Sequence, residues 1–216
     1  MTLEQPSLDG VHVTRYADKS AVSRPALLMD RDGVLVEEVN FLRSVGDVRL
    51  AEGAADIISL ARRMGWAVAV VSNQSGIARN LFGWSEYSAV EQEIARQLAL
   101  QGAGVDLVVA CAFHPDHTPN YGDMHALWRK PGPRMLQLAA DLINLDLKRS
   151  WIVGDRLSDL EAGHAAGLAG GVHLLTGYGK RHRSMVAKKN WAPFETLFAG
   201  NLNDAATCLA GRLTPA

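Results

Sequence analysis

The chain has 216 residues, 48% of them hydrophobic and 21% charged, with a formal net charge of −1. This composition is typical of one globular domain, and the balanced charge argues against nucleic acid as a partner. No apolar run is long enough to span a bilayer, so we expect no membrane association. Two cysteines are too few for a disulfide framework. We therefore expect a cytoplasmic protein, with a monomer as the default.

The N-terminal segment shows no regular period. Residues 1–24 are mixed and polar, and neither helical nor strand spacing is apparent. We predict that they form an N-terminal arm that lies on the main domain or is partly mobile. Residues 25–216 are then predicted to form a single α/β domain.

An apolar strand beginning at Ala26 is predicted to lead directly into Asp30, Asp32 and Gly33. In open parallel sheets, ligands bind outside the carboxyl ends of the strands. Two carboxylates one residue apart at such an end repel each other unless a cation or a proton neutralises part of their charge. The pair indicates a hard cation such as Mg²⁺, although this short motif alone fits an ordinary turn equally well.

The next segment is predicted to be a loop, a helix and a second strand. Residues 34–50 lack a period and are predicted to cross the mouth of the site, and apolar positions at helical spacing follow from Ala54 to Met64. Trp66 to Val71 is a continuous apolar run and therefore a buried strand. The polar turn that begins at Ser72 follows this strand and, taken alone, fits an ordinary turn.

The second half of the chain is predicted to continue the alternation. We expect a helix capped by Ser85, a strand over 106–113, a polar loop, and a helix after Pro133. A strand ending at Gly154 then places Asp155 at its tip, and Ser158 with Glu161 fits a capping box that begins the next helix. A last strand over 171–175, a basic run over 180–183 and a closing helix over 203–213 complete the pattern.

Four short motifs now stand at strand ends or before a helix, in the order Asp-Arg-Asp-Gly, Ser-Asn-Gln-Ser-Gly-Ile-Ala-Arg, Arg-Lys-Pro and Gly-Asp-Arg. Together they resemble the four motifs of the haloacid dehalogenase superfamily of phosphotransferases. They are most similar to the branch that contains the D-glycero-D-manno-heptose-1,7-bisphosphate 7-phosphatases and the histidinol-phosphate phosphatases. The alternation of elements predicts a Rossmann-like parallel sheet of five or six strands with helices on both faces. The resemblance implies that no large cap domain is present.

The resemblance also implies roles for individual residues. Asp30 would attack phosphorus to form an aspartyl-phosphate, and Asp32 would act as general acid and then general base. Mg²⁺ would be bound by Asp30, by the backbone carbonyl of Asp32 and by Asp155. Ser72 and Lys130 would hold the transferring phosphoryl group. The implied substrate contacts are Glu38, Val39, Asn40, Phe41, Asn73, Gln74, Ser75, Arg129 and Arg156.

The leading hypothesis is a Mg²⁺-dependent phosphatase that removes the 7-phosphate of D-glycero-D-manno-heptose 1,7-bisphosphate. Arg129 favours a bisphosphate, because its planar fork can bind two oxygens of a second, non-reacting phosphate. A phosphatase for histidinol phosphate or another small phosphomonoester is the alternative. A non-catalytic domain that binds phosphorylated ligands, and a phosphotransferase that passes the group to another acceptor, are the remaining hypotheses.

The loop after the third strand departs from the branch. Many members hold structural zinc there through a Cys-x-His pair and a later Cys-x-Cys pair. Cys111 matches the first ligand, but Phe113 stands at the histidine position. Zinc could still be bound by Cys111, His114, His117 and His125, which are acceptable ligand types. Loop histidines that bind no metal are the other interpretation.

Overall fold

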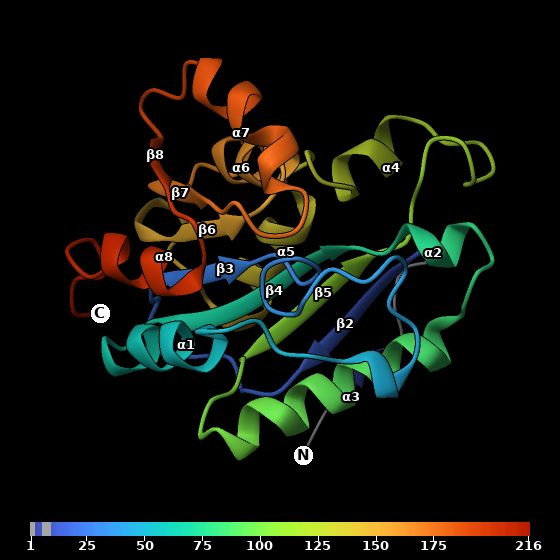
Figure 1. The fold of residues 1–216 in the computed structure, drawn as a ribbon, viewed down its shortest axis with the longest axis horizontal. Helices are drawn as coiled ribbons and strands as arrows, with labels where there is room; N and C mark the ends of the chain where they lie inside the picture. The colour runs from blue at the N-terminus through green and yellow to red at the C-terminus, as the bar shows by residue number, and fades with distance from the viewer. Residues whose placement is uncertain (1–2, 6–9) are drawn as a thin grey trace.

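The computed structural model describes residues 3–5 and 10–216 as an eight-stranded sheet flanked by helices (Figure 1). In spatial order the strands are β1 (Leu3–Gln5), β2 (Val11–Arg15), β5 (Leu107–Cys111), β4 (Ala67–Asn73), β3 (Ala26–Met29), β6 (Trp151–Gly154), β7 (Gly170–His173) and β8 (Glu195–Phe198). The six strands from β5 to β8 are parallel, which confirms the predicted α/β fold, and β1 and β2 add an antiparallel edge.

Helices cover both faces of the sheet, because the side chains of each strand alternate between the two faces. Leu27 and Met29 of β3 belong to one core cluster, together with residues of α1 (Ala54–Arg63), α3 (Trp84–Leu100) and α8 (Leu202–Leu209). Ala26 and Leu28 belong to the other, with α5 (Arg134–Ile143), α6 (Leu157–Ala165) and α7 (Gly179–Lys188). β3 therefore runs through the centre of the molecule.

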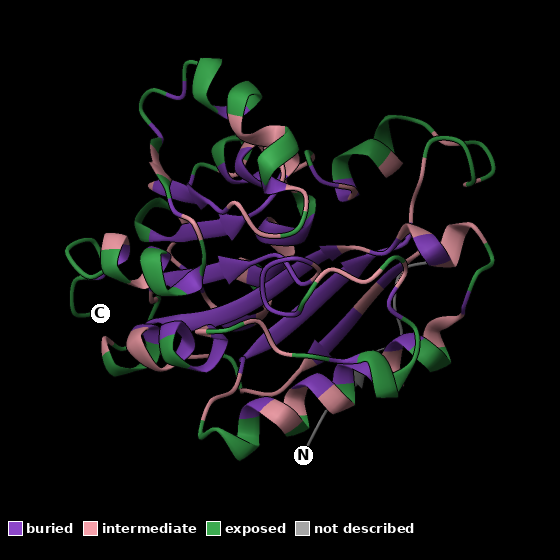
Figure 2. Cartoon of the chain, in the orientation of Figure 1, coloured by how far each residue is buried: buried purple, intermediate pink, exposed green. Residues whose placement is uncertain are grey.

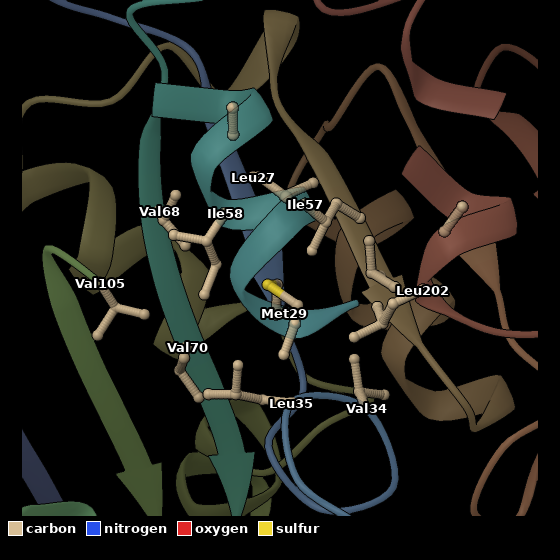
Figure 3. Packing of buried hydrophobic residues seen from close by; sticks show 14 of the residues in the cluster. Leu27, Met29, Val34, Leu35, Ile57, Ile58, Val68, Val70, Val105 and Leu202 are labelled. Atoms are coloured by element: carbon tan, nitrogen blue, oxygen red, sulfur yellow. The ribbon is translucent and has the colours of Figure 1, made fainter. Parts of the chain in front are cut away.

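The packing of α1 on the sheet shows how the central strand is fixed. Ile57 and Ile58 of α1 are fully buried and point toward Leu27, Met29 and Val68 (Figure 3). Figure 2 shows the same layering, with buried strands between helices whose outer faces are exposed. A strand covered on both faces is apolar throughout, so the first polar residue after it, Asp30, stands at the carboxyl edge of the sheet.

The N-terminal segment contains two strands, β1 and β2, that the sequence did not predict. β2 pairs antiparallel with β5, from Val11 opposite Cys111 to Arg15 opposite Leu107. Val11 and Val13 are buried in the core. Five residues with only two apolar side chains give too weak a period to be recognised, and the pairing with β5 makes this segment a strand. Whether residues 1–24 behave as a separate arm stays a prediction.

Two predicted helix starts are wrong in detail. α3 begins at Trp84 after Gly83, so Ser85 is not its cap. α6 begins at Leu157, and the carboxylate of Asp159 accepts a hydrogen bond from the backbone N–H of Arg156, in place of the predicted box of Ser158 and Glu161. The remaining helices are short: α2 (Ser75–Ala78), α4 (Asp123–Trp128), η1 (Val45–Asp47) and η2 (Leu147–Arg149).

Residues 34–50 form the predicted loop beside the site. Val34, Leu35 and Val36 are buried in it, and Val36 pairs with Leu50 in an isolated bridge. η1 and α1 are the helices between β3 and β4, so no large cap domain is inserted there. None of the helices formed by residues 10–216 combines the length and the apolar character needed to cross a bilayer.

Candidate active site

The predicted site residues converge at the carboxyl edge of the sheet, where the ends of β3, β4 and β6 meet. A cleft of about 390 Å³ opens there. Twelve of the predicted residues line it: Asp30, Asp32, Glu38, Val39, Asn40, Phe41, Asn73, Gln74, Ser75, Arg129, Lys130 and Arg156. Ser72 and Asp155 are buried at its base, with exposed fractions of 1% and 0%. The geometry therefore brings one site together from residues that lie far apart in the sequence.

Asp30 is held rigidly. Its backbone N–H donates to the carbonyl of Val153 at 3.0 Å, which anchors it against β6. Its Oδ1 accepts from the backbone N–H of Arg31 at 2.7 Å and lies 2.9 Å from Lys130 Nζ. Burial raises the pKa of Asp30 to about 6, and the Lys130 ammonium opposes this rise. The carboxylate is therefore mostly ionised at neutral pH, as a nucleophile must be.

Lys130 reaches three acceptors from a buried position. Its Nζ lies 2.9 Å from Asp30 Oδ1 and 2.7 Å from Asp159 Oδ1, and it donates to the carbonyl of Val71 at 2.8 Å. Burial lowers the pKa of Lys130, but the carboxylates of Asp159 and Asp30 outweigh it and raise the pKa overall. The side-chain amide of Asn73 brackets the backbone of Lys130 with two hydrogen bonds of 3.0 Å. The ammonium is therefore charged and fixed beside the carboxylate of Asp30.

Three carboxylates form a candidate metal site. Asp30, Asp155 and Asp159 each offer an oxygen, and these oxygens lie within 4.8 Å of one another. Asp155 Oδ2 accepts from the backbone N–H of Tyr178 at 2.6 Å, whereas its Oδ1 is buried without a hydrogen-bond partner. An orphaned buried carboxylate oxygen fits a hard cation. Burial, and then the charges of Asp30 and Asp159, raise the pKa of Asp155 to about 8, and the Tyr178 N–H and Arg156 oppose the rise.

Asp159 joins the acidic cluster in addition to the predicted ligands. Its Oδ2 accepts from the N–H of Arg156, and its Oδ1 lies 2.7 Å from Lys130 Nζ. Asp155 is the better ligand because the cation nearest its Oδ1, Arg156 Nε, is 3.9 Å away.

The side chain of Gln74 connects the second aspartate to the predicted phosphate contact. Its Nε2 donates to Asp32 Oδ2 and to Ser72 Oγ, each at 2.8 Å. Asp32 keeps 22% of its side chain exposed and lines the cleft. Glu38, also in the cleft, has its pKa raised to about 7 by burial and by Asp32, while Arg156 opposes the rise.

The outer side of the cleft is cationic. Arg129 donates to the carbonyl of Phe113 at 3.0 Å, and Arg79 Nη2 lies 3.1 Å from Nε2 of His114. The guanidinium of Arg156 stacks 3.8 Å above the ring of Tyr178. Neither Arg79 nor Arg129 has a carboxylate partner among the salt bridges of the described residues. This rim would complement a second anionic group. Arg79 and Tyr178 also line the cleft. They were not predicted as site residues, because only the folded chain brings them there.

The described residues give no support for the zinc hypothesis. Across residues 10–216, the only group of three or more such ligands close enough to share an ion is the aspartate cluster. Cys111 packs in the apolar core, and burial raises the pKa of its thiol to about 11, so it is not a ready thiolate. His125 instead packs edge-on against Phe113, with ring centroids 4.6 Å apart.

Comparisons with known proteins agree with this geometry. A family model described as HAD-hydrolase-like matches residues 127–205. A HAD-like phosphatase candidate from Mesorhizobium loti superposes with a TM-score of 0.80 at 32% identity, covering 98% of this chain and 96% of that one. The fold and the aspartate–lysine site thus define a hydrolase of the haloacid dehalogenase (HAD) type, and the chain belongs to this family.

Relatives with known names place the chain more finely within the family. It is 42% identical over 156 residues to D-glycero-β-D-manno-heptose-1,7-bisphosphate 7-phosphatase of Mesorhizobium japonicum, covering 68% of each chain. The enzyme of that name from Escherichia coli K12 is 32% identical, over 73% of this chain and 82% of the relative. A D,D-heptose 1,7-bisphosphate phosphatase from B. bronchiseptica, crystallised with magnesium and phosphate, superposes with a TM-score of 0.72 at 30% identity, over 87% of this chain and 98% of that one.

Proposed function

We propose that this protein is a Mg²⁺-dependent phosphatase that removes the 7-phosphate of D-glycero-D-manno-heptose 1,7-bisphosphate. The observation that carries the proposal is the buried Asp30, paired with Lys130 at 2.9 Å, beneath a cleft with a cationic rim. The names of the relatives support the choice of a heptose bisphosphate.

The proposed reaction has two steps. A carboxylate oxygen of Asp30 attacks phosphorus, the bond from phosphorus to the sugar oxygen breaks, and Asp32 gives its proton to the departing alkoxide. Asp32 then takes a proton from water, which attacks the aspartyl-phosphate, releases inorganic phosphate and regenerates Asp30. Lys130 and the hydroxyl of Ser72 would hold the transferring phosphoryl oxygens. Mg²⁺, bound by Asp30, Asp155 and the backbone carbonyl of Asp32, would offset their negative charge.

The cationic rim supports a bisphosphate. Arg129 is positioned by its bond to Phe113 and has no carboxylate partner, so its fork is available to the phosphate that does not react. Glu38 and the other residues of the 38–41 segment line the same cleft and would contact the sugar.

We further propose that the protein acts as a cytoplasmic monomer, which light scattering of the purified protein tests for oligomeric state.

Histidinol phosphate is the second candidate substrate. Glu38 is an acidic group in the cleft and would pair with the ammonium of that substrate when ionised. A non-catalytic phospholigand-binding domain is disfavoured, because such a domain has no need of a buried aspartate paired with a buried lysine.

The test is steady-state phosphate release with Mg²⁺ on the heptose bisphosphate anomers, fructose 1,6-bisphosphate and histidinol phosphate. We expect kcat/KM for the heptose to exceed the others by about 100-fold, which corresponds to about 2.7 kcal/mol of transition-state binding. Asp30→Asn should abolish turnover, and Asp56→Asn, at an exposed position of α1, should not. A preference for histidinol phosphate would replace the heptose assignment, and an active Asp30→Asn variant would refute the proposed nucleophile.

A further inference from the structure

Arg31 lies between the two aspartates in the sequence, yet its side chain turns into the protein interior. Only 1% of it is exposed, and it is among the largest fully buried side chains. A buried guanidinium destabilises the fold unless its charge and its donors are matched by partners. The partners of Arg31 therefore indicate what it does.

On one side the guanidinium holds Asp32. Arg31 Nε lies 3.2 Å and Nη2 lies 3.0 Å from both carboxylate oxygens of Asp32. Such a two-pronged contact fixes the orientation of a carboxylate as well as its position. Asp32 is therefore held from the interior while one edge of it faces the cleft.

On the other side the guanidinium is held by α3 and by the turn after β4. Nη1 donates to Glu91 Oε1 at 2.8 Å, and Nη2 donates to Gln74 Oε1 at 3.0 Å. The ring of Tyr87 lies 5.3 Å from the guanidinium carbon, a cation–π contact. Tyr87 and Glu91 are both buried, one helical turn apart on α3. Glu91 thus supplies the second negative charge that Arg31 needs.

Glu91 does not line the active cleft; it borders a separate hollow beside Thr14 and Tyr16. Its hydrogen bond toward the site is the one to Arg31, so this is the contact through which it can position a reacting group. We propose that Glu91 is a positioning residue: it anchors Arg31, which in turn holds the carboxylate of Asp32 where it exchanges a proton with the leaving group. This inference rests on the proposed function, in which Asp32 is the general acid.

The inference predicts an effect that depends on the leaving group. A sugar alkoxide leaves only if it is protonated, whereas acetate, the leaving group of acetyl phosphate, is stable as an anion. In the step that expels the leaving group, a misplaced general acid loses part of a contribution of about 10²- to 10⁴-fold, and it loses it only where that group needs a proton. A general disturbance of the fold would slow both substrates alike.

The experiment compares phosphate release from the heptose bisphosphate and from acetyl phosphate, with background hydrolysis subtracted. Glu91→Gln is expected to lower kcat/KM on the sugar about 10-fold or more while kcat/KM on acetyl phosphate stays within about twofold. This parameter reports the steps up to departure of the leaving group, so it excludes the later hydrolysis of the aspartyl-phosphate, which both substrates share. Glu93→Gln is the matched control, because Glu93 lies on the same helix and pairs with exposed Arg96. This control should change neither rate.

The Asp32→Asn variant tests the acid role of Asp32 separately from the positioning role of Glu91. If Asp32→Asn does not slow the sugar more than acetyl phosphate, the acid role in the proposed function fails. If Asp32→Asn does so and Glu91→Gln does not, the positioning role of Glu91 is overturned. If Glu91→Gln does not fold, Glu91→Asp keeps the charge but withdraws it from Arg31, and the same leaving-group ratio decides.

Discussion

At the scale of single residues, the carboxylate of Asp155 lies between two glycines whose backbones approach it closely. A Cβ on Gly33 would stand 2.7 Å from Asp155 Oδ2 and 3.0 Å from the Cα of Gly177. Gly33 also has a φ of +80°, a conformation that side chains disfavour. The turn after β3 therefore requires glycine for two independent reasons, and one of them, the close approach, concerns the candidate metal ligand Asp155.

We predict that Gly33→Ala weakens Mg²⁺ binding. The added methyl would push the Asp155 carboxylate away, and the positive φ adds about 1–2 kcal/mol of strain. The Mg²⁺ concentration for half-maximal activity should rise about 10-fold or more, measured by titrating metal into the chelator-treated enzyme. Gly211→Ala is the control, since a Cβ there meets nothing within 4 Å. An unchanged Mg²⁺ requirement in Gly33→Ala would contradict the assignment of Asp155 as a ligand.

The site residues differ in how far sequence could identify them. Asp30, Ser72, Lys130 and Asp155 stand in motifs at strand or helix ends, so local patterns and the family resemblance were enough. Arg31 gave no such signal, because its partner Glu91 lies 60 residues away. Glu91 lies on the apolar stripe of α3, one turn after Tyr87. A charged residue at such a position indicates that it is buried and has a partner of opposite charge.

At the scale of elements, the segment between β5 and α5 is held by aromatic packing around His125. His125 packs against Phe113 and stacks on Tyr121 with centroids 5.6 Å apart, and its Nδ1 accepts from the N–H of Gly122 at 3.1 Å. The carbonyl of Phe113 in turn accepts from Arg129. This packing connects the loop to the cationic rim.

We therefore expect His125→Ala to raise KM for the bisphosphate. Without the ring, Phe113 loses its partner and the guanidinium of Arg129 loses a fixed anchor. KM should rise about 3- to 10-fold, which is about 0.7–1.4 kcal/mol, with little change for a monophosphate substrate. His117→Ala, an exposed position of the same loop, serves as the control. Equal effects on both substrates would show that the loop does not act through the second phosphate.

A second prediction at this scale concerns β2. This strand covers the edge of β5 and buries Val11 and Val13. A chain that begins at residue 25 should lose about 3 kcal/mol or more of unfolding free energy, because two buried valines and an edge pairing are removed. Urea denaturation, with a chain that begins at Gly10 as control, measures the loss. An unchanged midpoint would support the separable arm predicted from the sequence.

At the scale of the whole molecule, the site gathers carboxylates whose negative charge a bound cation would offset. Asp30 and Asp155 have folded-state pKa values of about 6 and about 8, both above the ordinary pKa of 3.8 for an aspartate. The metal-free folded protein therefore binds protons that the unfolded chain has already released. Its stability is expected to fall as pH rises from about 4 to about 8, and to level off above that range.

Mg²⁺ binds the ionised carboxylates, so it should stabilise the protein more at higher pH. We predict that the difference in Tm between Mg²⁺ and chelator grows from about pH 5 to about pH 8. Taking the difference at each pH cancels the titration of all groups outside the site. A Tm difference that is constant, or largest at low pH, would contradict the role of the aspartate cluster as the metal site.

The sequence by itself determined the alternation of strands and helices and the strand-end position of the first and last aspartates, because periodicity and turn residues are local properties. Tertiary structure decided β2, the three-way contacts of Lys130, the inclusion of Asp159 in the acidic cluster, and the Glu91–Arg31–Asp32 chain. Asn73 and Lys130, 57 residues apart, meet only because the turn between α4 and α5 packs against the end of β4. Such partners depend on which faces the folded sheet brings together, and no local pattern encodes that.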